Sequence, residues 1–485
     1  MPRNLRIKTN SSPLLKRCST GIANLDDALS GGFPEHSMIL VGGGPGSGKT
    51  ILGMTFLVNG ADKFGEKGLY ISFSESKQTM YAELKSLGID LQKLENAKKF
   101  WFEEMMSVSG ASMGDALGQV VTTISKNGIK RVVLDSITAI GQSFEHEYQT
   151  RQILHTVVSK LVRNLGCTTL VISERLSQSL SDSHFEEFVA DGVIGLKHGP
   201  PRELEIRKMR GTELSHRKFI CTMHGGFDVL KTEIKHPTKP KIWKLIPNPE
   251  GMISTGSEDF DRALKGGFPV GSYVIFEADT HVTVPETRLI TAPLVLNQQA
   301  QGHAVLAFLS TGVSSKGFVE QARRYLPPDG LKYSRLAHVA VTDEERKEFA
   351  TILPYMTFLK GGKENLDVDT NILFKTLSDL KLLTGSKPAL RVIYYDALEG
   401  EASNVHNEIV LAMNRTQLFG DFTVGIARPS LSILPKLLDM VDWHFRLSKS
   451  HGTLTLQGIK PQTPLYAIQC DITEGFQKTK LIEVN

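Results

Sequence analysis

The 485-residue chain lacks the residue patterns that mark several large classes of protein. Its four cysteines are widely spaced and form no CxxC pair, so neither a zinc site nor a disulfide framework is indicated. No apolar run approaches the roughly 18 residues that a membrane-spanning helix needs. The basic stretch at residues 1–17 has no apolar core and is therefore not a secretory signal. These absences predict a soluble protein in a reducing, cytoplasmic setting.

The chain also lacks a strong charge of either sign and a histidine motif. Its net charge of +4 comes from 56 basic and 52 acidic residues, which is too balanced for a general nucleic-acid binder. The 14 histidines form no HxxxH or HExxH pattern, so no metal centre beyond Mg²⁺ is indicated. The composition, 40% hydrophobic and 22% charged, is that of a globular protein with more than one domain.

The sequence repeats itself at an offset of 235 residues, the separation of Ser19 from Ser254. Each of these serines opens a Ser-Thr-Gly triplet, followed by LSGGFP at residues 29–34 and by LKGGFP at residues 264–269. An apolar stretch follows both copies. The repeat predicts two homologous domains, over residues 18–230 and 250–485.

Residues 231–249 separate the two predicted domains. This segment holds five lysines and four prolines, and both residue types oppose packing into a core. A solvated linker is the simplest interpretation, and a basic contact surface is the alternative.

Apolar stretches alternate with helix-period stretches in the first repeat. The strands are expected at residues 38–41, 69–73, 131–134, 169–173 and 192–196. The helices are expected at residues 50–59, 79–87, 113–126 and 148–165. This alternation predicts an α/β fold of two tandem domains, each a mainly parallel sheet with helices on both faces.

A glycine-rich segment between the first strand and the first helix fits the pattern GxxxxGK[ST]. Glycines allow main-chain N–H groups to turn inward around phosphate oxygens, and the following helix presents its positive end to them. The pattern predicts an ATP site in which Lys49 meets the β- and γ-phosphates and the Thr50 hydroxyl binds Mg²⁺. The predicted nucleotide-binding residues are Gly43, Gly44, Pro45, Gly46, Ser47, Gly48, Lys49, Thr50 and Ile51.

An aspartate ends the strand predicted at residues 131–134. A strand-end carboxylate beside a phosphate loop commonly holds the Mg²⁺ ion through water. Asp135 is therefore the second predicted metal residue, together with Thr50.

The sequence resembles the KaiC-like branch of the RecA superfamily, which occurs in archaea and bacteria. Four segments carry the resemblance: STGxxxLDxxLxGGFP at residues 19–34, LDS at 134–136, SER at 173–175 and KMRGT at 208–212. The resemblance implies two tandem RecA-like domains that form a homo-oligomeric ring, commonly a hexamer, with ATP between subunits. It also implies that Lys208 and Arg210 reach a neighbour's γ-phosphate and that Glu174 occupies a sensor position.

One departure from the family pattern concerns hydrolysis. The family usually carries two adjacent acids after the second strand, and the first of them activates the attacking water. Here Ser74 stands at the first position and only Glu75 remains. Because a neutral hydroxyl is a poor general base near pH 7, we expect slow ATP hydrolysis, with Glu75 as the candidate base.

The second repeat lacks the phosphate loop. Residues 278–285 read ADTHVTVP, so Val284 stands where the first repeat has Lys49. Asp396 preserves the shape of the metal strand without a phosphate site to serve. The second domain is therefore predicted to be a pseudo-ATPase. The autokinase activity of the family's clock protein is not expected in it.

Three functions stay open on the sequence. The first is a nucleotide-dependent regulatory switch with an unknown protein partner, and the second is a recombination or repair ATPase acting on DNA. A transcription regulator of the archaeal gas-vesicle repressor type is the third, and it shares the ATP site. The loops at residues 141–150 and 176–187, which are basic in recombinases, are acidic here. Nucleic-acid binding is therefore not favoured.

Overall fold

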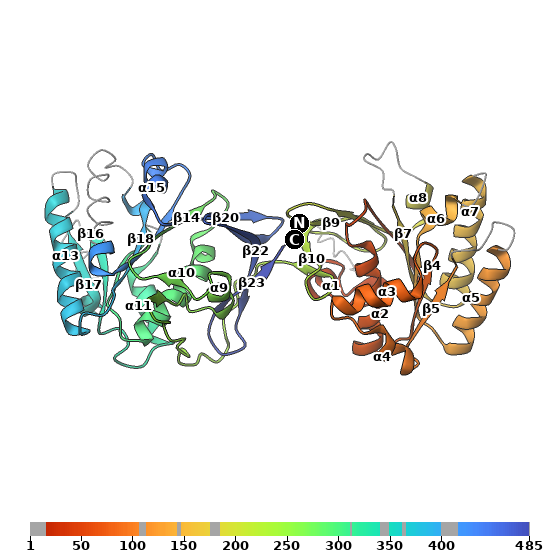
Figure 1. Cartoon of the computed structure of the whole chain (residues 1–485), viewed down its shortest axis with the longest axis horizontal. Helices are drawn as coiled ribbons and strands as arrows, with labels where there is room; N and C mark the ends of the chain where they lie inside the picture. Colours follow the sequence, from red (N-terminus) through yellow and green to blue (C-terminus); the bar gives the residue numbers. More distant parts are fainter. Residues whose placement is uncertain are drawn as a thin grey trace, which may run out of the picture. The chain divides into compact units, whose positions relative to one another are not determined.

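The computed structural model describes residues 16–105, 113–142, 147–174, 185–310, 313–339, 349–360, 365–398 and 416–484. The basic stretch predicted at residues 1–17 thus lies almost entirely outside the described residues, as do large parts of the loops at 141–150 and 176–187. The chain forms two compact units (Figure 1). The first comprises Met1–Leu230 with Val484–Asn485, and the second comprises Lys231–Glu483.

The first unit is built on a nine-stranded sheet, counted over the described residues, in the order β11-β10-β9-β8-β3-β7-β6-β4-β5. The strands from β8 to β5 in this order run parallel, and β9 to β11 add an antiparallel edge. The strands are β3 (Met38–Gly43), β4 (Gly68–Ser72), β5 (Phe100–Glu104), β6 (Arg131–Asp135), β7 (Thr168–Ser173), β8 (Gly192–Lys197), β9 (Glu203–Met209), β10 (Lys218–Thr222) and β11 (Asp228–Leu230). A small ribbon pairs β1 (Arg17–Cys18) with β2 (Phe33–Pro34).

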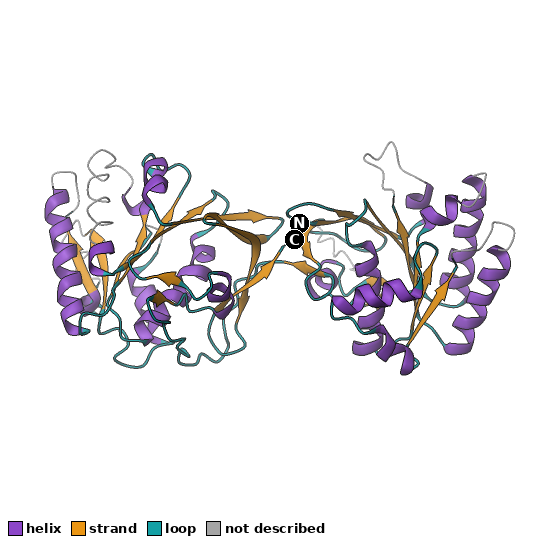
Figure 2. Ribbon diagram, in the orientation of Figure 1, coloured by secondary structure: helices purple, strands orange, loops and turns teal. Residues whose placement is uncertain are grey.

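Helices cover both faces of this sheet, as Figures 1 and 2 show. Alternate residues of β3 enter different cores: Ile39 and Val41 pack with α2, whereas Met38 and Leu40 pack with α5. The helices are α1 (Ala23–Ala28), α2 (Lys49–Lys63), α3 (Lys77–Ser86), α4 (Leu91–Asn96), α5 (Met113–Asn127), α6 (Ile137–Gln142), α7 (Glu147–Thr156), the π-helix η2 (Val157–Asn164) and α8 (Phe185–Val189). The predicted α/β fold with a mainly parallel sheet is confirmed.

The second unit repeats this architecture with one additional strand. Its sheet has ten strands among the described residues, in the order β17-β16-β15-β18-β19-β14-β20-β21-β22-β23. The extra strand β17 (Met356–Leu359) lies at the edge, within the segment by which the second repeat is longer. The other strands are β14 (Tyr273–Ala278), β15 (Val305–Phe308), β16 (Ser334–Val339), β18 (Leu390–Tyr394), β19 (Phe422–Ala427), β20 (Trp443–Ser450), β21 (Thr453–Lys460), β22 (Gln462–Asp471) and β23 (Lys478–Glu483). A ribbon pairs β12 (Met252–Ile253) with β13 (Phe268–Pro269).

The helices of the second unit also lie on both faces of its sheet (Figure 2). They are α9 (Glu258–Ala263), α10 (Val284–Ala300), α11 (Ser315–Arg323), the 3₁₀ turn η4 (Leu353–Tyr355), α13 (Leu366–Leu383), the 3₁₀ turn η6 (Tyr395–Leu398) and α15 (Leu434–Met440). Among the helices that the structure describes in both units, none combines the length and the apolar character needed to cross a membrane.

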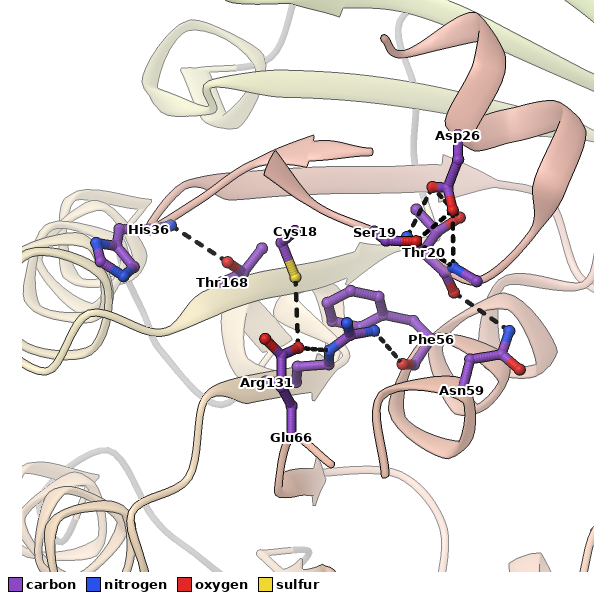
Figure 3. A network of polar contacts seen from close by, with 11 residues as sticks. Cys18, Ser19, Thr20, Asp26, His36, Phe56, Asn59, Glu66, Arg131 and Thr168 are labelled. Atoms are coloured by element: carbon purple, nitrogen blue, oxygen red, sulfur yellow. Dashed lines mark hydrogen bonds and ion pairs between the residues drawn. The ribbon is translucent and has the colours of Figure 1, made fainter. Parts of the chain in front are cut away.

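The Ser-Thr-Gly triplet forms the same hydrogen-bond network in both units. In the first unit, the Ser19 and Thr20 hydroxyls donate to the two oxygens of Asp26, over 2.5 and 2.7 Å (Figure 3). In the second unit, Ser254 and Thr255 donate to Asp261 over the same distances. The network ties the start of each unit to its first helix, and its repetition supports common ancestry of the two units.

A buried arginine joins β6 to α2 in the first unit. The Arg131 side chain is 1% exposed, and its Nε donates to Glu66 over 2.6 Å (Figure 3). Its Nη1 donates to the Phe56 carbonyl over 2.9 Å, and its guanidinium lies 4.5 Å from the centre of the Phe56 ring. These contacts hold the strand that ends in Asp135 against the helix that begins at Lys49.

The segment at residues 231–249 forms no helix or strand and most of its residues are exposed, as expected for a solvated linker, but part of it packs on the second unit. It belongs to the second unit, and Trp243 is only 4% exposed there. The Trp243 indole N–H and the Ile246 main-chain N–H both donate to the Asn297 side chain of α10, over 3.2 and 2.8 Å. One aromatic residue and paired main-chain groups therefore outweigh the lysines, whose ammonium groups can stay in water while the backbone packs.

Candidate functional site

The glycine-rich segment forms a tight turn from the end of β3 to the first turn of α2, which brings all nine predicted residues together. Two of its glycines are required by geometry. Gly48 has a φ of +96°, and a Cβ there would lie 2.7 Å from the Met223 sulfur. A Cβ on Gly43 would lie 2.4 Å from the Leu196 carbonyl oxygen. A side chain at either position would open the turn.

The N-terminus of α2 has no side-chain cap. Its first main-chain N–H groups can therefore serve an external anion, and the helix dipole favours negative charge at this end. Lys49 donates its Nζ to the Gly44 carbonyl over 2.9 Å, which folds the ammonium back over the turn. Burial lowers the pKa of Lys49, while the carboxylates of Asp135 and Glu174 oppose the shift. An uncapped helix end beside a partly buried ammonium fits a phosphate group.

The two predicted metal residues lie in direct contact. The Thr50 hydroxyl donates to Oδ2 of Asp135 over 2.9 Å, and the Tyr70 hydroxyl donates to the same oxygen. Burial raises the pKa of Asp135, although the hydrogen bonds from Tyr70 and Thr50 and the charge of Lys49 act in the opposite direction. A carboxylate and a hydroxyl beside a phosphate cradle are the oxygen ligands that Mg²⁺ prefers.

Asp135→Asn tests this carboxylate. Because the raised pKa means that folding penalises the charged form, the neutral amide should raise the melting temperature of the nucleotide-free protein by a few degrees. The same change should remove the extra stabilisation that Mg²⁺ gives in the presence of ATP. Thermal unfolding with ATP, with and without Mg²⁺, measures both effects. A variant that is destabilised without nucleotide, or that keeps its response to Mg²⁺, would contradict the assignment.

Glu75 lies close to this site but is held by the turn before α3. Its main-chain N–H donates to the Ser72 hydroxyl over 3.0 Å, and that hydroxyl donates to the Glu75 carbonyl over 2.7 Å. Burial raises the pKa of the Glu75 carboxyl, and the charges of Glu83 and Asp135 add to the shift. Ser74, at the position where the family carries its base, is exposed.

Three further predicted residues are engaged within their own unit. The Lys208 Nζ donates to the carbonyls of Glu187, Phe188 and Ala190, at the end of α8. Arg210 lies one residue beyond β9 and pairs with Asp191 over 2.9 Å. Glu174 directly follows β7 and is exposed, with its main-chain N–H donating to Thr138. The charge of Glu174 thus acts on Lys49. Lys208 and Arg210 do not contact the loop in this unit.

Tyr70 is a site residue that the sequence analysis missed. It lies in β4, is fully buried, and its hydroxyl contacts Asp135. The available signal was a tyrosine between Leu69 and Ile71 in a strand expected to be buried, because a buried tyrosine hydroxyl needs a hydrogen-bond partner.

In the second unit, the corresponding loop is occupied by the protein itself. The Arg428 Nη1 donates to the carbonyls of Ala278, Asp279 and Val282, over 3.3, 2.7 and 2.7 Å. Arg428 follows β19 as Glu174 follows β7, so a cation replaces the carboxylate at this position. In this loop the carbonyl oxygens point inward, toward the Arg428 guanidinium. These oxygens would repel a phosphate, which needs inward-facing N–H groups.

The N-terminus of α10 is also satisfied internally. The Thr283 main-chain N–H and hydroxyl both donate to the Glu286 carboxylate over 2.8 Å, and Lys449 lies 2.7 Å from its other oxygen. Burial opposes ionisation of Glu286, but the hydrogen bonds from Lys449 and Thr283 lower its pKa. An internal carboxylate therefore occupies the helix end that is uncapped in α2.

Strand register corrects one sequence assignment in this unit. Asp135 pairs with Ile172, which pairs with Val41, whereas Tyr394 pairs with Ile426, which pairs with Phe276. Because Phe276 is the repeat partner of Val41, Tyr394 and not Asp396 stands in the place of Asp135. Asp396 follows two residues later, in η6, where it accepts a hydrogen bond from Ser310 over 2.5 Å.

Comparisons with known proteins find similarity to KaiC and KaiC-like proteins. The family model described as "ATPase: KaiC" matches residues 18–232. The circadian clock oscillator protein KaiC of Thermostichus vulcanus is 28% identical over 340 residues, which cover 65% of this chain and 64% of that protein. The protein of the same name from Synechococcus elongatus is 32% identical over 229 residues, or 44% of each chain. The matched part is thus about half to two thirds of the length of these curated relatives. A solved structure of a KaiC-like protein from Pyrococcus horikoshii is 29% identical, with a TM-score of 0.40, and covers 44% of this chain and 99% of that one.

Proposed function

Because residues 18–232 form a KaiC-like ATPase domain, we propose that the first unit binds ATP with Mg²⁺ and hydrolyses it slowly, as the switch of an oligomeric regulatory protein. The observation that carries this proposal is the contrast between the two helix ends. The α2 end is an uncapped cradle with Lys49, Thr50 and Asp135 around it, whereas the α10 end is filled by Glu286. Only the first unit would therefore take a nucleotide.

Different residues of the first unit would bind the phosphates and the Mg²⁺ ion. The main-chain N–H groups of residues 43–51 would bind the phosphates, and Lys49 would neutralise their charge. Thr50 and Asp135 would hold Mg²⁺, which shields phosphate charge when it is bound. Tyr70 fixes the orientation of the Asp135 carboxylate through its hydroxyl. Glu174 directly follows β7, which pairs with the loop strand β3, and would lie near the γ-phosphate region.

Slow hydrolysis is the expected consequence of Ser74. Introducing the missing acid, Ser74→Glu, should raise the ATP turnover rate by at least about tenfold, because a positioned general base typically contributes about 10²–10⁴-fold. Steady-state release of phosphate measures the rate. Ser74→Gln is the matched control, since it has the same size without the charge, and it should leave the rate unchanged. No gain for Ser74→Glu would mean that Glu75 already serves as the base.

The proposal includes a homo-oligomer, with a hexameric ring as the expected form and ATP at its subunit interfaces. In such a ring, Lys208 and Arg210 would leave the carbonyls of α8 and Asp191 to meet a neighbour's ATP. Size-exclusion chromatography with light scattering, with and without Mg-ATP, tests this step. A monomer in both conditions would contradict the oligomeric part of the proposal and leave the ATP site intact.

The second unit would contribute a fixed surface for assembly or for a regulatory protein partner. With Arg428 and Glu286 in place of a nucleotide, neither ATP hydrolysis nor autokinase activity is expected there. The acids at residues 141–150 and 176–187 oppose a DNA-acting ATPase. ATP-dependent binding of single-stranded DNA that weakens with salt would reverse this preference.

A further inference from the structure

Arg202 reaches the phosphate loop from a distant part of the first unit. It lies between β8 and β9, 156 residues after Gly46, and its side chain belongs to none of the motifs read from the sequence. It is only 9% exposed, which is unusual for an arginine that pairs with no carboxylate in the described ion pairs. Burying a charged side chain costs free energy unless hydrogen bonds compensate for the lost water.

Arg202 is anchored at both ends. Its Nη1 donates to the Gly46 carbonyl over 2.6 Å and lies 2.7 Å from Nδ1 of His198. Because a guanidinium can only donate, the His198 Nδ1 accepts at this contact. The Arg202 carbonyl accepts the main-chain N–H of Cys221 in β10 over 3.0 Å, which fixes the arginine backbone to the sheet. The guanidinium is therefore a rigid donor aimed at the tip of the loop.

The Gly46 carbonyl is the group that this donor controls. Gly46 has a φ of +69° and no side chain, and the Ser47 N–H of the adjoining peptide makes only one long hydrogen bond, to the Gly44 carbonyl over 3.3 Å. If the carbonyl turned toward the cradle, its oxygen would oppose phosphate. A charge-assisted hydrogen bond to Gly46 holds the orientation that suits an anion before the nucleotide arrives.

We propose that Arg202 is a positioning residue for phosphate binding, holding the Gly46 peptide so that the loop N–H groups face the nucleotide. The inference rests on the proposed function and adds a determinant of affinity to it. The second unit shows the opposite use of the same chemistry. There Arg428 donates to three carbonyls of the loop, whereas Arg202 donates to one carbonyl at the tip of its loop.

Arg202→Met, which keeps the length of the side chain and removes its donors, tests the proposal. Isothermal titration calorimetry with the full chain and Mg²⁺ should show the dissociation constants for ATP and ADP rising together by about tenfold. Both nucleotides should be affected because the loop binds the phosphates that they share. The exposed Arg163, changed to methionine, is the matched control and should bind as the wild type does.

The possible outcomes separate the two proposals. A wild-type chain that binds no ATP defeats the proposed function, whereas wild-type affinity in a folded Arg202→Met variant overturns the role of Arg202 alone. A lower melting temperature without nucleotide, at unchanged ATP affinity, would also overturn it, because the role would then be structural. If Arg202→Met fails to fold, Arg202→Lys keeps a cation with a different donor geometry. Its affinity should fall about threefold, and wild-type affinity would count against the proposal.

Discussion

Lys49→Ala is expected to lower the affinity of the chain for ATP by at least about 100-fold. The lysine lies over the loop with its Nζ 2.9 Å from the Gly44 carbonyl, so a bound phosphate would exchange a weak internal contact for a full ion pair. A charge-assisted contact of this kind contributes roughly 3 kcal/mol, which corresponds to about 100-fold in affinity. Equilibrium binding of ATP with Mg²⁺ measures the loss.

The same variant should keep the stability of the nucleotide-free protein. Burial lowers the pKa of Lys49, so folding penalises its charged form, and removing that charge should not weaken the unit. Exposed Lys85 of α3, changed to alanine, controls for a general loss of positive charge. ATP affinity that survives Lys49→Ala in a folded protein would mean that the nucleotide binds elsewhere.

The second large effect is expected from Arg428→Met in the second unit. This change leaves the carbonyls of Ala278, Asp279 and Val282 without their donor. Because each hydrogen bond from a charged group contributes about 1.5–3 kcal/mol, we expect a loss of roughly 3 kcal/mol from the three, after water replaces part of them. For a unit of this size, the melting temperature should fall by roughly 6–12 °C.

The number of bound nucleotides separates structural loss from functional loss in this variant. Since Arg428 acts in the unit that should not bind ATP, the ATP affinity and stoichiometry of the folded chain should match the wild type. The exposed Arg324, at the C-terminal end of α11, can be changed to methionine as a control for loss of an arginine. An Arg428→Met chain that is as stable as the wild type would contradict the account of the filled loop. A second bound ATP would mean that Arg428 alone excludes the nucleotide from this unit.

The sequence predicts the features that depend on local pattern. The five strands and four helices expected in the first repeat all occur, because apolar alternation and helical periodicity report which face of each element is buried. The phosphate loop is equally local, since its glycines and its Lys-Thr pair are adjacent in the chain. The internal repeat was visible because Asp26 and Asp261 each close the same network with a neighbouring Ser-Thr pair.

Features that depend on contacts between residues far apart in the chain could not be predicted from the sequence. Tyr70 and Arg202 act at the loop across 65 and 156 residues, and no spacing rule relates them to Asp135 or Gly46. Strand register, and not sequence order, places Tyr394 at the position of Asp135. The segment around Trp243 packs through contacts with Asn297, Tyr325 and Phe476, which its lysine-rich composition conceals.

The central claim is that one unit of this chain binds a nucleotide and the other is filled by its own side chains. A structure determined in saturating Mg-ATP tests it most directly. We expect triphosphate density against the loop at residues 43–50 and, at residues 278–285, Arg428 and Glu286 in their present contacts. Density for a nucleotide in the second unit, or none in the first, would contradict the account.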